Sequence, residues 1–139
     1  MKKLLFLLTL PILMLSCTFY GDDTNIDTVN LSVKQNEWTE NFDTNGLRYY
    51  YASFNMPEIT SNVYYNGSIQ VYLVSGAEAS QKVLPYVRHY EDVNGTRWTR
   101  TIDYDFVAGN LMIYVTNSDF VADQPEAMDF RVVIMSQPN

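Results

Sequence analysis

The chain has 139 residues with 16 acidic and 9 basic side chains, which gives a net charge of −7. An acidic chain without a basic run is a poor partner for nucleic acid, because that binding depends on clustered Lys and Arg. The length suits one domain, and 47% of the residues are hydrophobic, enough for a core that does not depend on disulfides. We therefore expect one globular domain that does not bind nucleic acid.

The N-terminus has the pattern of a secretory signal. Lys2 and Lys3 precede an apolar run at residues 4–15. These 12 residues are too few to cross a bilayer, which takes about 20 residues in a helix. A basic start followed by a short apolar run is typical of a signal peptide, so we expect residues 1–16 to be one.

A cysteine motif closes the apolar run. Leu15-Ser16-Cys17 resembles the lipobox of bacterial lipoproteins, with Met14 in the place where that pattern prefers Leu. The resemblance implies cleavage before Cys17, acylation of that cysteine with fatty acids such as palmitate, and attachment to a membrane. Acylation also explains why the only cysteine stands here, since a lone thiol would be a liability in an oxidising compartment. The alternative is an ordinary signal peptide with an incidental cysteine.

The residues after the cysteine bear on location and domain limits. Thr18 replaces the Asp that favours retention in the inner membrane, so we expect the outer membrane, with the protein facing the periplasm or the outside. Residues 17–28 are largely polar and acidic, which predicts the acylated cysteine and a flexible tether ahead of a single domain at 29–139. Loss of Lys2 and Lys3 with the signal leaves 7 basic against 16 acidic residues, a net charge of −9. That charge argues further against nucleic acid and anionic lipid as partners.

From residue 29 onward, apolar and polar residues alternate with a period of two, which is typical of half-buried strands. We predict eight strands, at residues 29–33, 47–54, 59–65, 68–74, 81–90, 96–106, 111–116 and 129–135. Turn signals separate several of them, among them Asp43-Thr44-Asn45-Gly46, Asn66-Gly67 and Asn94-Gly95. No window of ten or more residues has a convincing helical period. The pattern predicts an all-β fold, an antiparallel β-sandwich of about seven to nine short strands, Ig-like or jelly-roll-like.

Two strands allow finer predictions. Pro85 lies inside the expected strand 81–90 and cannot donate a ladder hydrogen bond, so that strand should lie at a sheet edge or contain a bulge. In the strand 96–106, Trp98 shares one face with Ile102, Tyr104 and Phe106, whereas the other face is polar. We therefore expect Trp98 in the core.

Several short segments between residues 59 and 134 recur together in proteins of one kind. They are Ile59-Thr60-Ser61-Asn62-Val63, Gly67, Ile69-Gln70-Val71-Tyr72, Leu84-Pro85-Tyr86, Asn110-Leu111-Met112-Ile113 and Phe130-Arg131-Val132-Val133-Ile134. In kind and order they resemble small, mostly uncharacterised envelope lipoproteins of the Bacteroidetes type, in which a Trp often stands at the place of Gln81. The resemblance implies an all-β fold and an envelope location. It implies no activity and no functional residues.

The side chains that could support catalysis or bind a metal are few. His89 is the only histidine, and no nucleophile motif accompanies it. Asp103 and Asp105 share a strand face, which suits acid–base work on glycosides or Ca²⁺ binding, but that face is also the ordinary solvated side of the strand. Asp119 and Asp123 lie in a polar loop without the spacing of a calcium loop. We therefore expect no catalytic residue, no metal and no cofactor.

Tyrosine is the most informative residue type, with 11 in the chain. Several predicted strands carry apolar groups on both faces, and only one face of each strand is needed for the core. Tyr50, Tyr72 and Tyr114 fall on the second faces, where they would form an exposed aromatic patch. We predict these three as a candidate binding surface, on condition that their strands are neighbours in one sheet. The alternative is that loops cover this second face.

Three functions remain open. The first is a non-catalytic envelope lipoprotein that binds a glycan or another envelope protein, and the resemblance adds that lipoproteins of this group often serve glycan uptake. The second is a structural role in a surface assembly, through strand addition at an open sheet edge. The third is a small hydrolase, which would need two carboxylates facing each other across a pocket. The sequence favours the first, a binding protein rather than an enzyme.

The anchor gives the first testable prediction. Cys17→Ala removes the only acylation site that the motif offers, so this variant should stay uncleaved or become soluble. Metabolic labelling with an alkyne-tagged fatty acid measures the modification, and the wild type should be labelled while the variant is not. An unlabelled wild type that is released into the medium would contradict the lipoprotein assignment.

Overall fold

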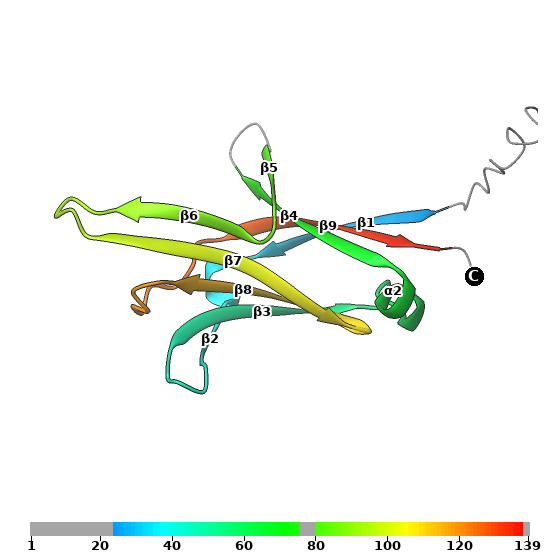
Figure 1. Cartoon of the computed structure of the whole chain (residues 1–139), viewed down its shortest axis with the longest axis horizontal. Coiled ribbons are helices and arrows are strands. Elements are labelled where there is room, and N and C mark those ends of the chain that lie inside the picture. The colour runs from blue at the N-terminus through cyan, green and yellow to red at the C-terminus, as the bar shows by residue number, and fades with distance from the viewer. Residues whose placement is uncertain (1–23, 76–79, 138–139) are drawn as a thin grey trace, which may run out of the picture.

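The computed structural model describes residues 24–75 and 80–137, which form two antiparallel β-sheets packed face to face (Figure 1). The four-stranded sheet has the order β1 (Asn25–Val33), β9 (Met128–Ser136), β4 (Ser68–Ser75) and β5 (Ser80–Val83). The five-stranded sheet has the order β2 (Thr39–Phe42), β3 (Arg48–Met56), β8 (Gly109–Asn117), β7 (Arg97–Val107) and β6 (Tyr86–Glu91). Two short helices, η2 (Gln35–Glu37) and α2 (Ser61–Asn66), complete the described elements. The predicted antiparallel β-sandwich of seven to nine strands is confirmed.

The first strand begins earlier than its sequence pattern indicates. β1 starts at Asn25 and pairs with β9 along its whole length, from Asn25 opposite Ser136 to Val33 opposite Met128. Residues 25–28 therefore belong to the domain, and the predicted tether 17–28 includes four residues too many. All four are exposed, so no buried face marks them as a strand. The predicted signal peptide and Cys17 lie outside the described residues.

The core lies between the central strands of the two sheets. Their inward side chains alternate along the chain and are almost fully buried: Phe130, Val132 and Ile134 in β9, and Leu111, Ile113 and Val115 in β8. Burying a side chain of this size contributes about 1.5–3 kcal/mol relative to exposure. One hydrogen bond also connects the sheets, since the Tyr104 hydroxyl donates to the Ile69 carbonyl oxygen at 2.8 Å.

The predicted strand at 59–65 is wrong, because Ser61–Asn66 form the helix α2, which lies at one end of the sandwich (Figure 1). Thr60 caps this helix, as its Oγ1 accepts a hydrogen bond from the Val63 amide at 3.2 Å. The apolar residues whose alternation suggested a strand therefore lie in or next to a short helix, which buries Val63. None of the described helices is long and apolar enough to cross a membrane.

The predicted hairpin at Asn66-Gly67 is wrong for the same reason. Gly67 ends α2, and its φ of −104° is not the positive value that a tight hairpin turn requires. A Cβ on Gly67 would lie 2.5 Å from the carbonyl oxygen of Met135. Glycine is therefore needed here for the close approach of two backbones rather than for a turn.

The predicted strand 81–90 is two strands in different sheets. β5 ends at Val83 and β6 begins at Tyr86, so the chain passes from the four-stranded to the five-stranded sheet at Leu84-Pro85. Both β5 and β6 are edge strands, which confirms the edge position predicted from Pro85.

The predicted turns at Gly46 and Gly95 are confirmed, and they share one arrangement. Both glycines have positive φ, +79° and +82°. In each turn an aspartate three residues earlier, Asp43 or Asp92, accepts two backbone N–H donors through Oδ1 at 2.8 Å. These backbone hydrogen bonds lower the pKa of both carboxyl groups below the ordinary value.

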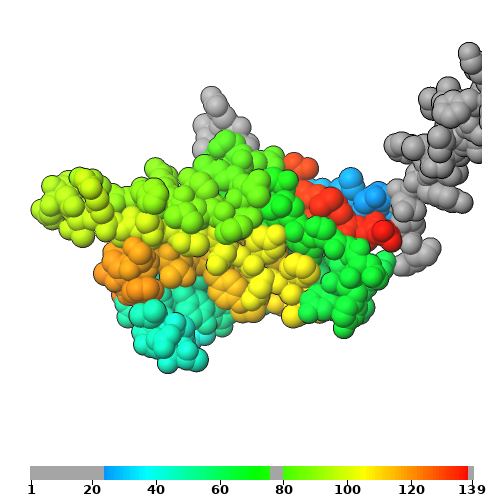
Figure 2. Space-filling view, viewed as in Figure 1, coloured from blue at the N-terminus to red at the C-terminus, as the bar shows by residue number. Residues whose placement is uncertain are grey.

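Trp98 does not lie in the core, contrary to the prediction. The β6–β7 hairpin extends beyond the facing sheet (Figure 1 and Figure 2), so its inner face is only half covered there. Trp98 stacks on Tyr90 of β6 with ring centroids 5.4 Å apart. The core tryptophan is Trp38, which is 4% exposed, packs edge-on against Phe130 and donates from Nε1 to the Glu126 carbonyl oxygen.

The two tryptophans should therefore differ in their effect on stability. Trp38→Ala should cost about 3–5 kcal/mol in the free energy of unfolding, because it empties a core site. Trp98→Ala should cost less, since it loses a ring stack of about 0.5–1.5 kcal/mol and partial burial. Denaturant unfolding of both variants measures the difference. A larger loss for Trp98→Ala than for Trp38→Ala would contradict this placement.

Candidate functional site

The predicted patch of Tyr50, Tyr72 and Tyr114 does not exist. Tyr50 is buried in the core, on the inner face of β3. Tyr72 and Tyr114 are half-buried on outer faces, but β4 belongs to the four-stranded sheet and β8 to the five-stranded sheet. These two side chains point away from opposite sides of the sandwich, so they cannot contact one small ligand.

A different set of tyrosines meets on the outer face of the five-stranded sheet. Because Tyr50 faces the core, its neighbours Tyr49 and Tyr51 face outward. Tyr51 lies directly opposite Tyr114 in the β3–β8 register. The ring centroid of Tyr49 is 6.0 Å from that of Tyr114 and 6.4 Å from that of Tyr51. We call Tyr49, Tyr51 and Tyr114 the tyrosine face.

Hydrogen bonds orient two of these rings. Asn41 Nδ2 on β2 donates to the Tyr49 hydroxyl at 2.9 Å, and the Tyr114 hydroxyl donates to Asp105 Oδ2 at 2.9 Å. Burial, and next the hydrogen bond to Asp105, raise the pKa of Tyr114 to about 12. Tyr114 is therefore neutral at physiological pH, and its ring is positioned by the Asp105 carboxylate.

Carboxylates continue this surface across β7. Asp103 lies opposite Tyr114 in the β7–β8 register, and Asp105 follows two residues along on the same face. Burial, and next the charge of Asp105, raise the pKa of Asp103. Within residues 24–75 and 80–137, the Asp103 carboxylate has no cation or side-chain donor as a partner. It is therefore available to accept hydrogen bonds from a ligand.

A shallow cleft of about 380 Å³ lies beside the tyrosine face. Tyr49, Tyr114 and Asp103 line it on the sheet side, and Phe120 and the β2–β3 turn line it on the other. Figure 2 shows this turn, in cyan, beside the β8–β9 loop, in orange, and the Arg48 guanidinium donates to the Phe120 carbonyl oxygen across that contact. The volume falls in the range of small-molecule sites, about 300–1,000 Å³.

The remaining candidates do not form a catalytic or metal site together. His89 is exposed on β6, and its imidazole makes no hydrogen bond or ion pair with any described residue. Asp119 is exposed, and Asp123 Oδ2 lies 3.5 Å from Arg100 Nη2. Among the residues that the structure describes, no three His, Cys, Asp or Glu side chains come together to hold a metal ion.

A buried arginine was not among the residues predicted from the sequence. Arg100 lies on the inner face of β7, in line with the core residue Ile102, and is 7% exposed. Its Nε donates to Asn117 Oδ1 at 2.9 Å, and its Nη1 lies 2.6 Å from Glu126 Oε2. A charged residue on the otherwise apolar face of the strand 96–106 was the signal that could have revealed it.

Comparison with protein-family models, with curated proteins and with solved structures gave no significant match. The chemistry of the site therefore follows from its own residues. Three outward rings offer flat apolar surfaces, and two neighbouring carboxylates offer hydrogen-bond acceptors. Such a surface can stack a ring and accept hydrogen bonds from its hydroxyl groups.

The contact between Tyr114 and Asp105 can be tested by titration. The ¹³Cζ resonance of Tyr114 should keep its protonated position at about pH 11, where a tyrosine with the ordinary pKa of about 10 is mostly ionised. Asp105→Asn should lower the Tyr114 pKa, because it removes the negative charge next to the hydroxyl, and Asp103→Asn should lower it less. Equal shifts in the two variants would contradict the hydrogen bond.

Proposed function

We propose that this protein is a non-catalytic, lipid-anchored protein of the outer membrane that binds a neutral glycan at its tyrosine face. The observation that carries the proposal is the placement of three outward tyrosine rings beside two carboxylates, with the Tyr49 ring 6.0 Å from that of Tyr114 and 6.4 Å from that of Tyr51. The anchor on Cys17 is supported by the lipobox motif in the sequence.

The two kinds of side chain match the two kinds of surface on a sugar. A pyranose ring presents C–H groups on its faces, which pack against aromatic rings, and hydroxyl groups around its rim. Carboxylates accept hydrogen bonds from hydroxyl donors, and such charge-assisted bonds are stronger than neutral ones. Tyr49 and Tyr114 line the same cleft as Asp103, so one sugar could use both.

The charges favour a neutral glycan over an acidic one. Asp103 and Asp105 lie next to each other on this face, and the whole chain carries a net charge of −7. A uronic acid or a sulfated sugar would bring a third negative charge to this surface. Like charges at close range oppose binding, so neutral hexoses suit the tyrosine face better.

Binding is favoured over hydrolysis because most of the nearby carboxylates have other partners. A glycosidase needs two carboxyl groups on either side of the scissile bond, roughly 5–10 Å apart. Asp43 also lines the cleft, but its Oδ1 accepts two backbone N–H donors in the β2–β3 turn. Asp105 accepts the Tyr114 hydroxyl. Of the three, only Asp103 lacks such a partner in the part of the chain that the structure describes, which suits a binding role.

One observation favours a second candidate function, a structural role in a surface assembly. Among the described strands β1 pairs only with β9, which leaves its other side without a strand partner. This edge is nine residues long and carries one charged side chain, Asp27. Long edges with few charges are templates for the addition of another strand.

A glycan array probed with the wild type and with the double variant Tyr49→Ala/Tyr51→Ala tests the first function. The wild type should bind neutral oligosaccharides. The variant should bind them at least about tenfold more weakly, because it loses two ring contacts of about 0.5–1.5 kcal/mol each and the area that they bury.

Tyr65→Ala is the matched control, since Tyr65 lies on α2 and is 77% exposed. This variant should bind as the wild type does, and both variants should remain folded, with one cooperative melting transition. Binding only to acidic glycans, or equal loss in both variants, would contradict the proposal. A wild type that binds no glycan but self-associates would favour the assembly through β1 instead.

A further inference from the structure

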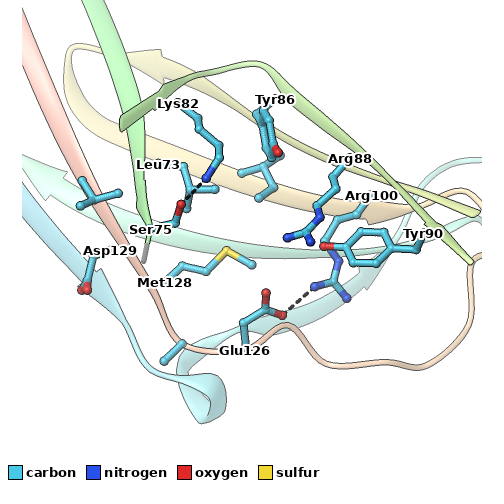
Figure 3. Close-up of a pocket in the computed structure, with 13 residues that line it drawn as sticks. Leu73, Ser75, Lys82, Tyr86, Arg88, Tyr90, Arg100, Glu126, Met128 and Asp129 are labelled. Atoms are coloured by element: carbon cyan, nitrogen blue, oxygen red, sulfur yellow. Dashed lines mark hydrogen bonds and ion pairs between the residues drawn. The ribbon is translucent and has the colours of Figure 1, made fainter. Parts of the chain in front are cut away.

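A second cavity lies between the two sheets, on the side where the chain crosses from β5 to β6 (Figure 3). Its volume is about 310 Å³, the size of a small-molecule site. Leu73, Ile102 and Met128 form an apolar part of its lining, and all three are buried core residues. The inner face of the β6–β7 hairpin forms another wall, so this cavity lies on the opposite side of the five-stranded sheet from the tyrosine face.

Three cations are held on aromatic rings along this wall. Lys82 Nζ lies 5.5 Å from the ring centroid of Tyr86. The guanidinium carbons of Arg88 and Arg100 lie 5.1 Å and 5.6 Å from the ring centroid of Tyr90. Cation–π contacts of this kind fix the position of a charged group without neutralising it. The cavity therefore presents positive charge in a chain that is acidic overall.

The two arginines differ in how their charge is balanced. Arg88 and Arg100 lie directly opposite each other in the β6–β7 register, an arrangement that is unfavourable for like charges. Arg100 is balanced by Glu126 and Asp123, at 2.6 Å and 3.5 Å. Arg88 has no carboxylate within ion-pair distance among the described residues. One guanidinium group at the cavity thus lacks a counter-ion.

The other acidic residue that lines the cavity does not supply that counter-ion. Asp129 alternates with the buried Met128 and Phe130 along β9, so its side chain lies on the outer face of the sheet. Its Oδ1 accepts a hydrogen bond from the Ser32 hydroxyl at 2.6 Å. In Figure 3 it points away from Arg88, whereas Lys82 and Arg88 reach toward the space between the strands.

We infer that this cavity binds a small organic carboxylate with an apolar body. The planar guanidinium of Arg88 matches the two oxygens of a carboxylate and can donate to both. Lys82, whose Nζ donates to Ser75 Oγ, adds a second positive charge. The apolar body would pack on Leu73, Ile102 and Met128. A phosphate dianion fits less well, because it has no apolar part for this lining and the Glu126 carboxylate stands beside it.

Calorimetric titration of the full-length protein, purified in a non-ionic detergent, tests this site with benzoate and benzamide as probes. The two probes have nearly the same shape, but only benzoate carries a carboxylate. Benzoate should bind and benzamide should bind at least about tenfold more weakly, since a hydrogen bond between charged groups is lost. Arg88→Gln should weaken benzoate binding by a similar factor, and Arg88→Lys should weaken it less.

Arg97→Gln is the matched control, because Arg97 lies on the same hairpin and pairs with Glu91 outside the cavity. It removes the same charge and should leave benzoate binding within about twofold of the wild type. Equal losses in Arg88→Gln and Arg97→Gln, equal binding of both probes, no binding of benzoate, or tighter binding of inorganic phosphate would each overturn the inference. Glycan binding at the tyrosine face should be unchanged in Arg88→Gln, so the two sites can fail independently.

Discussion

The packing of β9 against β8 is the interaction on which the rest of this structure depends. Both strands are central in their sheets, and their inward side chains are almost fully removed from water. Because side chains alternate along a strand, burial of one face fixes what the other face presents. Every residue opposite this core, on either sheet, is thereby placed toward solvent, and the tyrosine face is one result of that constraint.

The same packing explains why two different surfaces occur on one sheet. Where the four-stranded sheet covers the five-stranded one, the inner face is apolar and closed. The β6–β7 hairpin continues past this cover (Figure 1), so Arg88, Tyr90 and Arg100 on its inner face border a cavity instead of a core. The outer face carries the carboxylates Asp103 and Asp105, and the inner face of the hairpin carries cations, so surfaces of opposite charge lie on the two sides of one sheet.

The sequence predicted most strands because alternation is a local property. It could not assign Tyr49, Tyr50 and Tyr51, since a run of three aromatics gives both faces of β3 apolar surface, and only the partner sheet decides which face is inner. Tyr72 was misplaced for a related reason, because strand order is set by long-range pairing. Trp98 lies on the inner face of β7, as predicted, but beyond the end of the facing sheet. No local sequence pattern shows where the facing sheet ends.

The partners of charged residues also could not be predicted from the sequence. Arg100 is a charged residue on an otherwise apolar strand face, and it can be buried there because Glu126, 26 positions further along, supplies a counter-ion that no local pattern identifies. Asp103 and Tyr114 were each recognised as candidates but not as neighbours, since Tyr114 comes from the next strand. Individual site residues could therefore be predicted from the sequence, whereas which of them lie next to one another in the fold could not.

The measurement that tests the account most directly is an aromatic ¹H–¹³C titration of the protein with the neutral oligosaccharide that binds best. Resonances of Tyr49, Tyr51 and Tyr114 should shift together with one saturation curve, because they share one surface. Those of Tyr72, on the opposite sheet, and Tyr86, at the inner cavity, should not move. Shifts confined to Tyr72 or to Tyr86, with the tyrosine face unchanged, would contradict the binding of the glycan at the tyrosine face.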